Sequence, residues 1–245
     1  MTPAGMLALQ RAAGNRVARR VLARHADDLV AYSGGQTGQV AVFEAGKLRY
    51  RSPAVSGHPG NSEWEVDVGP TPTGMYTIRP QITNKPVTKS GRGVCGAAAI
   101  SSGYQEITST EKTQCAAGSA HYCNVPCPTA ADPAQMCWTP RDCWGSKRIK
   151  IEGSADVAKP TGGKQHRDGF YLHGGNPADP ISSGCVKSLD DDVFTHIRKL
   201  TGKKGKVRFC VGSACPSWVG AALASGVITL PEVTIVGDPS LAEEG

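Results

Sequence analysis

Short runs in which apolar and polar residues alternate constrain the fold of this chain more than any other feature. Alternation with a period of two is typical of half-buried strands, and the glycine or proline that bounds each run permits a tight turn. The clearest runs are residues 29–33, 38–46, 47–52 and 63–69. We therefore predict antiparallel hairpins from about residue 28 onward.

Further strand-like segments follow these hairpins. Residues 69–78, with the sequence GPTPTGMYTI, join a rigid turn to a strand, and residues 190–200 have the pattern of a helix. The other predicted strands are residues 147–152, 169–172 and 205–211. The chain has 30 glycines, 17 prolines and only 6% aromatic residues, which argues against an all-helical bundle. The expected fold class is mainly β with few helices.

The first residues differ from the rest of the chain. Residues 6–26 are rich in Ala, Leu and Arg and predict a basic amphipathic helix. They lack the small-residue cleavage site of a secretory signal, and no run of about 18 apolar residues predicts a membrane-spanning helix. The net charge of +6 suits an acidic polymer, and bacterial walls, nucleic acids and anionic membranes all fit that description.

Nine cysteines are a high count for 245 residues. They are Cys95, Cys115, Cys123, Cys127, Cys137, Cys143, Cys185, Cys210 and Cys215. The stretch from 115 to 143 has little hydrophobic periodicity, so it needs disulfides or a metal because it buries no core of its own. The candidate ligands of a zinc alternative are Cys123 and Cys127 with Cys137, Cys143 or His121. Their spacing fits no standard zinc pattern well. We treat residues 93–145 as an insertion, and we expect disulfides, no metal and no cofactor.

One stretch carries the residue types of nucleophilic catalysis. A predicted strand ends at His173, and a loop rich in Gly and Pro returns 12 residues later to Cys185. A loop of that length can fold back so that the imidazole reaches the thiol, as activation of a cysteine nucleophile requires. An adjacent imidazolium lowers the pKa of a cysteine from ~8.5 by several units, so we predict a thiolate and imidazolium ion pair.

Gly184 separates Ser183 from this cysteine. A glycine there lets consecutive backbone N–H groups point at one spot beside the sulfur, which predicts an oxyanion hole in which one donor contributes on the order of 3 kcal/mol. In the opposite interpretation, Cys185 is half of a structural disulfide and His173 is an ordinary histidine at a strand end. The odd number of cysteines and the strand-loop-return arrangement favour catalysis.

These motifs resemble the L,D-transpeptidase catalytic family of the YkuD type. The similar segments are RDGFYLHGGNP (167–177), the SxGC motif that ends at Cys185, GPTPTGMYTI and the early Ser56-Gly57. The short loop between His and Cys is most similar to the compact branch found among antibacterial type VI secretion effectors. Apart from the insertion, the resemblance covers residues 38–211. It implies a β-sandwich or barrel, with a catalytic domain at 28–212 between a segment 1–27 and an extension 213–245.

The resemblance also implies residue roles. His173 is the expected base, Cys185 the nucleophile and Gly184 part of the oxyanion hole, with Ser183 in support. The residues expected to contact substrate are Arg167, Tyr171, Gly174 and Lys187. Lys187 stands where better-known members have Arg, and a lysine cannot make the bidentate contact of Arg with a carboxylate. A backbone carbonyl often orients the base in this family, and the side-chain alternatives here are Asp168 and Asp179. His166 lies near the site in sequence and is a weaker candidate for substrate contact.

The implied activity is modification of peptidoglycan stem peptides, as an L,D-carboxypeptidase, an L,D-transpeptidase or a D-amino-acid exchange enzyme. Residues 9–16, LQRAAGNR, resemble the N-terminal segment of cargo proteins of extracellular contractile injection systems. That resemblance implies a loading tag on an antibacterial toxin that acts in a rival's periplasm or wall and can be opposed by an immunity protein. We expect neither nucleic acid nor membrane insertion.

Two other functions remain open at this point. A papain-like peptidoglycan amidase or endopeptidase uses the same chemistry, but such enzymes normally present Cys before His, and here His173 precedes Cys185. A non-catalytic, disulfide-stapled wall-binding or structural component of an injection particle is the alternative outside enzymes.

Overall fold

The computed structural model describes residues 28–79, 81–91, 96–111, 139–175, 177, 181–200 and 205–225. The strands are β1 (Leu29–Tyr32), β2 (Thr37–Glu44), β3 (Lys47–Ser56), β4 (Gly74–Ile78), β5 (Tyr104–Glu106), β6 (Lys147–Glu152), β7 (Ala155–Ala158), β8 (Lys164–Arg167), β9 (Tyr171–His173), β10 (Val186–Ser188) and β11 (Val207–Val211). The helices are α2 (Pro140–Trp144), α3 (Asp192–Leu200) and α4 (Ser217–Ser225), and a short 3-10 helix is η1 (Gly212–Ala214).

Eight strands form a closed ring. They follow the order β4-β11-β1-β2-β3-β10-β9-β6, the pairing of β6 with β4 closes the ring, and β5 adds to β6. Most neighbours are antiparallel, whereas β1 with β11 and β9 with β10 are parallel. Closure of a sheet removes the unpaired edges that strands otherwise expose. The predicted mainly β, barrel-like fold is confirmed.

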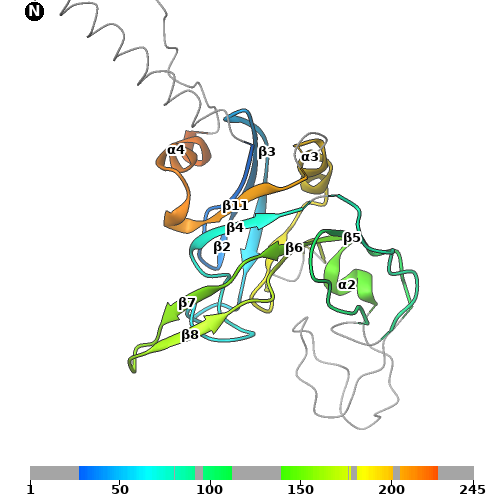
Figure 1. The fold of residues 1–245 in the computed structure, drawn as a ribbon, viewed down its shortest axis with the longest axis horizontal. Coiled ribbons are helices and arrows are strands. Elements are labelled where there is room, and N and C mark those ends of the chain that lie inside the picture. Colours follow the sequence, from blue (N-terminus) through cyan, green and yellow to red (C-terminus); the bar gives the residue numbers. More distant parts are fainter. Residues whose placement is uncertain are drawn as a thin grey trace, which may run out of the picture.

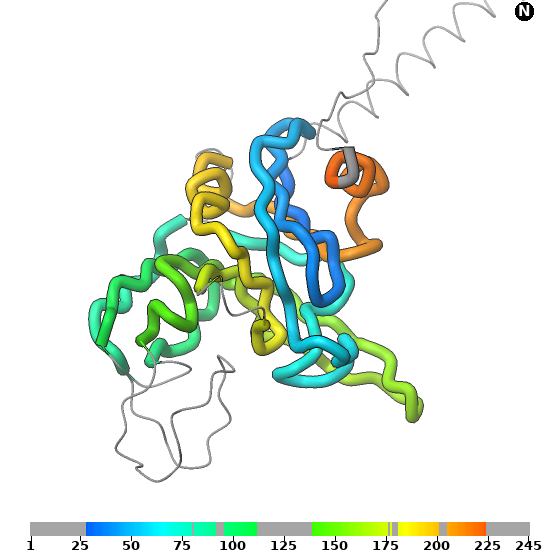
Figure 2. Tube along the Cα trace, turned by 180° about the vertical axis from the view of Figure 1, so that it is seen from behind, coloured from blue at the N-terminus to red at the C-terminus, as the bar shows by residue number. Residues whose placement is uncertain are grey.

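The alternation along β1 shows how the two faces of the barrel wall are buried. Its four residues are fully buried, yet Val30 and Tyr32 belong to the interior core while Leu29 and Ala31 pack on the outer face. Helix α4 contributes Val219 to that outer cluster and lies beside the blue strands in Figure 2. β1 therefore tolerates an unbroken apolar sequence because both of its faces are covered.

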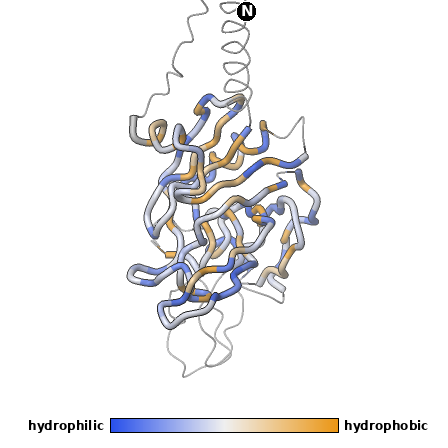
Figure 3. Tube along the Cα trace, turned by 60° about the vertical axis from the view of Figure 1, so that its left-hand side comes forward, coloured by the Kyte–Doolittle hydropathy of each residue, from blue (hydrophilic) through white to orange (hydrophobic). Residues whose placement is uncertain are grey.

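Helix α3 adds an apolar side to the interior core. Its buried residues are Val193, Phe194, Ile197 and Leu200, with the spacing of one helix face. Figure 3 shows hydrophobic stretches interspersed with hydrophilic ones along the trace. The helix predicted at 190–200 is confirmed, with its first turn at Asp192.

The strand predicted at residues 63–69 is wrong. This segment forms consecutive turns, in which the Glu65 N–H donates to the Ser62 carbonyl (3.0 Å) and the Gly69 N–H to the Glu65 carbonyl (2.9 Å). Asp67 has a φ of +64°, and Val66 is 51% exposed. The alternation of Trp, Val and Val is present, but the N–H groups of Glu65 and Gly69 are used within the turns and not by a neighbouring strand.

The described parts of the predicted insertion are integrated into the fold. β5 pairs with β6, and Tyr104 on it is fully buried in the interior core. Trp144 at the end of helix α2 contacts the rings of Tyr171 and His173 in β9. The predicted N-terminal helix and the cysteines of the zinc alternative other than Cys143 lie outside the described residues.

Two features were not predicted from the sequence. The hairpin of β7 and β8 forms a separate two-stranded sheet that projects from the body (Figure 1). After β11, η1 lies in the loop that a disulfide between Cys210 and Cys215 closes, and α4 follows this loop. Within the described residues, no helix is long and apolar enough to cross a membrane.

Candidate active site

Three neighbouring strands present core residues on one face and polar residues on the other. Ile149 of β6, Leu172 of β9 and Val186 of β10 belong to the interior core. Because side chains alternate along a strand, the residues on either side of these point to the opposite face. The residues of that polar face are Arg148, Lys150, Tyr171, His173 and Lys187. Directly paired residues share a face, so this register places one positively charged strip beside His173.

Cys185 lies immediately before β10 and on the same polar face. It is a free thiol and is 9% exposed. Cys143, Cys210 and Cys215 are all disulfide-bonded. Among the cysteines that the structure describes, the thiol available for chemistry is therefore that of Cys185, which is not half of a disulfide.

Ser182 holds the turn that leads into the cysteine. Its Oγ donates to the Cys185 carbonyl (2.5 Å) and accepts the Gly57 N–H (3.0 Å), and its own N–H donates to the Gly57 carbonyl (3.2 Å). A Cβ on Gly57 would lie 2.4 Å from the backbone nitrogen of Pro70, so no side chain fits there. Ser182 is the serine of the SxGC motif, but the residue predicted to support the site was Ser183.

A second set of hydrogen bonds joins this turn to the GPTPTG segment. Thr71 is fully buried; its N–H donates to Ser56 Oγ (2.8 Å), and its hydroxyl donates to the Gly184 carbonyl (2.7 Å). Ser56 Oγ also lies 3.2 Å from Thr71 Oγ1. Both sets of buried hydrogen bonds join segments far apart in the sequence, so they hold the backbone beside Cys185 in one geometry.

Gly184 occupies a backbone conformation that favours glycine, with φ +79°. A Cβ there would lie 2.8 Å from Nη2 of Arg167, whose guanidinium donates to the carbonyls of Gly69 (3.3 Å) and Glu63. The Gly184 N–H donates to the Ser182 carbonyl (3.0 Å). The predicted oxyanion hole stays a prediction, and it requires this hydrogen bond to open if the Gly184 N–H is one of its donors.

His173 is buried and has a defined tautomer. Its Nδ1 lies 2.5 Å from the Gly174 carbonyl oxygen, so Nδ1 carries the proton and Nε2 is left as an acceptor. The indole of Trp144 meets the imidazole edge to face, with 5.1 Å between ring centroids. A backbone carbonyl therefore orients His173 rather than Asp168, which lies beside His166 instead. Asp179 lies outside the described residues.

The register fixes how the two central residues relate. Val186 pairs with Leu172 and Lys187 with His173, so Cys185 lies beside Tyr171. The offset from Cys185 to the position opposite His173 is two residues, or roughly 7 Å along a strand. The Tyr171 backbone also hydrogen-bonds the sulfur, which lowers the pKa of Cys185 against the larger effect of burial. Both side chains project from one face of adjacent strands. The predicted contact between the imidazole and the thiol stays a prediction.

Burial makes the resting site neutral. It raises the pKa of Cys185 to about 11 and lowers the pKa of His173 to about 3. The hydrogen bond to Gly174 opposes the shift of His173, and the nearby Lys187 and Arg148 reinforce it. The thiol and the imidazole are both uncharged at neutral pH, which differs from the ion pair that the sequence predicts, because the sequence does not show how deeply the pair is buried.

Three cationic side chains lie near the thiol, and two of them, Arg148 and Arg167, are buried. Arg148 is 1% exposed, donates to Gln105 Oε1 (2.9 Å from Nε) and has its guanidinium 4.5 Å from the Trp144 ring centroid. Lys150 Nζ lies 4.6 Å from the Tyr171 ring centroid. Lys150, Arg148 and Arg167 each lower the pKa of Cys185, although burial outweighs them. No carboxylate of the described residues pairs with Arg148, so this face favours an anionic ligand or a thiolate.

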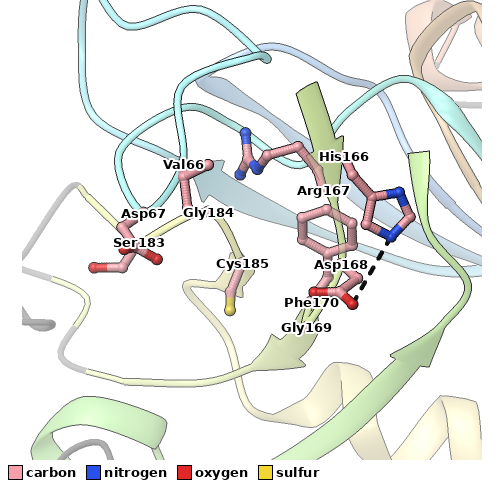
Figure 4. A pocket seen from close by; sticks show the side chains of 10 residues that line it. All are labelled: Val66, Asp67, His166, Arg167, Asp168, Gly169, Phe170, Ser183, Gly184 and Cys185. Atoms are coloured by element: carbon pink, nitrogen blue, oxygen red, sulfur yellow. Dashed lines mark ion pairs between the residues drawn. The ribbon is translucent and has the colours of Figure 1, made fainter. Parts of the chain in front are cut away.

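A pocket of about 300 Å³ opens beside the sulfur (Figure 4). Cys185, Gly184 and Ser183 line it together with Arg167 and Phe170. The other lining residues are Val66, Asp67, His166, Asp168 and Gly169. The turns at 63–69 and the end of β8 thus form its walls.

The structure brings the predicted site residues to two sides of Cys185. Ser183, Gly184 and Arg167 line the pocket. The other three lie next to His173: Tyr171 in β9, Gly174 directly after β9 and Lys187 in β10. The Tyr171 hydroxyl accepts the Ile100 N–H (3.0 Å), and Lys187 is 2% exposed.

Three further residues of the site were missed from the sequence. Arg148 and Trp144 come from outside the motif that carries His173 and Cys185, and Thr71 lies in the GPTPTG turn, where nothing marked it as a contact of Gly184. An alternation test on residues 147–152 would have placed Arg148 opposite the core.

Within the described residues, no group of three or more His, Cys, Asp or Glu side chains is arranged to hold a metal ion. The arrangement offers a buried thiol at a pocket, with an oriented imidazole and cations on the strand face beside it. These groups suit covalent attack on a carbonyl group of an anionic peptide. No protein-family model and no curated protein sequence matches this chain.

Proposed function

We propose that this protein is a cysteine enzyme of peptidoglycan stem peptides, acting as an L,D-carboxypeptidase, an L,D-transpeptidase or both. The observation that carries the proposal is the free thiol of Cys185 at a pocket, on the same sheet face as a histidine whose Nδ1 proton is held by a carbonyl. The resemblance of the SxGC and HGGNP segments to L,D-transpeptidases supplies the substrate class.

Cys185 attacks the carbonyl of the L-configured centre of the diamino acid residue in the stem. Because thiol and imidazole start neutral, the sulfur loses its proton to Nε2 of His173 as the new carbon–sulfur bond forms. The imidazolium then protonates the amine of the leaving D-alanine, and the carbon–nitrogen bond breaks to leave a thioester. Arg148, Lys150 and Arg167 stabilise the sulfur while it carries negative charge.

Water as acceptor gives a shortened stem, whereas an amine gives a crosslinked or exchanged stem. Each outcome removes donors for ordinary crosslinking, so delivery into a rival's periplasm would be toxic. Residues 1–27 are the proposed loading tag for a contractile injection particle, and an immunity protein is a proposed partner.

The test is incubation of the full chain with tetrapeptide muropeptides, followed by mass spectrometry. We expect loss of the mass of D-alanine, a trapped thioester on Cys185, and no product with Cys185→Ala. Cys215→Ala is the matched control, because that cysteine lies in the disulfide with Cys210 on the α4 side of the barrel. No change in mass with the wild type, or equal change with Cys185→Ala, would contradict the proposal.

A non-catalytic wall-binding or structural component is the second candidate. The observation in its favour is the burial that raises the pKa of Cys185 to about 11, since unreactive structural cysteines have such surroundings. Labelling of the thiol with iodoacetamide separates the two candidates. An enzyme is supported if Cys185 reacts faster in the presence of muropeptide-like anions. A scaffold is supported if Cys185 does not react under any native condition.

A further inference from the structure

The pocket beside Cys185 contains a second histidine that the acylation chemistry above does not use. His166 of β8 lines this pocket together with Cys185 and Asp168. In Figure 4 its ring and the Asp168 carboxylate lie on the other side of Cys185 from Asp67 and Ser183. The next residue, Arg167, approaches the Gly184 turn, which ties the end of β8 to the backbone around the nucleophile.

His166 is oriented by a carboxylate. Asp156 is its direct partner in the β7–β8 pairing, and Asp156 Oδ1 lies 2.9 Å from His166 Nδ1. A carboxylate at Nδ1 holds the proton on that nitrogen, so Nε2 becomes the basic atom of the neutral ring. Nε2 is 4.0 Å from Asp168 Oδ2, and the imidazole side chain is 62% exposed, so solutes reach it.

The charges of this pocket suit an amine. Asp67 and Asp168 are two carboxylates in its lining, while Arg167 is the cation among the lining residues. An acceptor amine reaches the site as an ammonium ion, which the carboxylates attract, but it can attack a carbonyl only after it loses a proton. A water acceptor needs no such acidic lining.

We propose that His166, oriented by Asp156, is the base that deprotonates an amine acceptor, so that the thioester on Cys185 is resolved by aminolysis with an amino acid or a second stem. This inference rests on the proposed function. The ammonium ion gives one proton to Nε2 of His166, and its nitrogen then attacks the thioester carbon. The carbon–sulfur bond breaks as the amide forms, and the second proton of the nitrogen passes to the departing sulfur through His173, which restores the thiol.

The test offers the full chain a tetrapeptide muropeptide with D-methionine as the amine, and mass spectrometry gives the ratio of exchanged to hydrolysed stem. Thioester formation is followed separately by intact-protein mass. His166→Asn keeps an N–H donor for Asp156 but removes the base, and we expect its ratio to fall at least about 10-fold while thioester formation keeps its wild-type rate. Asp156→Asn should shift the ratio in the same direction. The matched control is His196→Asn on α3, where the ring stacks on Tyr50 outside the pocket.

The outcomes separate this inference from the proposed function. If the wild type forms no thioester, the proposed function fails and the inference with it. If the thioester forms but the wild type only hydrolyses it in the presence of D-methionine, the inference alone is overturned. An unchanged ratio in His166→Asn has the same meaning, because the variant folds and acylates yet still transfers to the amine.

Discussion

Gly184 has a left-handed backbone conformation and leaves no room for a side chain. Both properties affect the geometry beside Cys185. Its φ is +79°, and a Cβ would lie 2.8 Å from Arg167 Nη2 and 3.4 Å from the Gly69 carbonyl oxygen. An L-residue in this conformation costs about 1–2 kcal/mol. A side chain at position 184 would also displace the Arg167 guanidinium, which lies beside the nucleophile. Backbone strain alone would not have this effect.

We therefore expect Gly184→Ala to lose about 1–2 kcal/mol of unfolding free energy and to lose most of its activity on muropeptides. Gly35→Ala is the matched control, because Gly35 has a φ of +75° and no atom within 4 Å of its Cβ position. The control should lose similar stability and keep its activity. Urea unfolding and product formation measure the two effects, and equal activity in both variants would contradict the role assigned to Arg167 and Gly184.

His173 makes the stability of the protein depend on pH. Burial lowers its pKa from 6.5 to about 3, so between these values the unfolded chain binds a proton that the folded chain does not. The free energy of unfolding falls as pH is lowered from about 6.5 towards 3, by up to about 1.4 kcal/mol per pH unit. His173→Asn retains an N–H donor and removes the titration, so its slope in this window should be shallower.

Urea unfolding at several pH values between 4 and 7 checks this prediction. Cys185→Ala is the control, because burial raises the pKa of Cys185 to about 11, outside the window. The control should keep the wild-type slope. A variant at position 173 with the wild-type slope would mean that the imidazole is not buried in its neutral form.

At the level of elements, η1 and α4 are tied to the barrel by a short disulfide loop. Cys210 is fully buried in β11, and Cys215 closes a loop with a sequence separation of 5. A loop of this size stabilises a fold by on the order of 2 kcal/mol. α4 packs on the outer cluster with Leu29 and Phe43, away from the polar face of β9 and β10.

The variant Cys210→Ala/Cys215→Ala should therefore unfold at a lower guanidinium concentration, with a loss on the order of 2 kcal/mol, and keep its activity on muropeptides. Guanidinium titration and product analysis at 25 °C measure both. Loss of activity in a variant that remains folded would show that the α4 side of the barrel influences the site.

Elements also show where sequence patterns succeed. The strand at 147–152 was predicted with the bounds that β6 has, because apolar and polar residues alternate there and a partner exists on each side. Residues 63–69 alternate equally well but form turns, because the Glu65 carboxylate accepts the Ser62 N–H and the Asn61 amide. Alternation is a local property, whereas a strand also needs an unpaired neighbour at the right place.

At the scale of the whole molecule, the closed barrel begins with its first strand, β1. β1 begins at Leu29, pairs with both β2 and β11, and has no exposed residue, so it belongs to the closed barrel. Asp28 Oδ1 accepts the Ala45 N–H (3.0 Å) just before it.

We expect deletion of residues 1–27 to leave thermal unfolding and activity close to the values of the full chain, whereas deletion through residue 33 removes β1 and prevents folding. Circular dichroism with a thermal scan and muropeptide digestion measure both truncations. A folded product of the longer deletion would contradict the closed-barrel topology. Loss of activity in the shorter one would assign residues 1–27 a role beyond the proposed loading tag.

Residues a few positions apart are enough to predict the alternating strands, the apolar side of α3 and the short loop between His173 and Cys185. The folded chain, in contrast, pairs β6 with β4 and brings Arg148 and Trp144 into the site. It also makes Ser182 rather than Ser183 hold the turn and leaves thiol and imidazole neutral. The physical reason is that register, burial and desolvation arise from contacts between distant segments, which no local pattern contains.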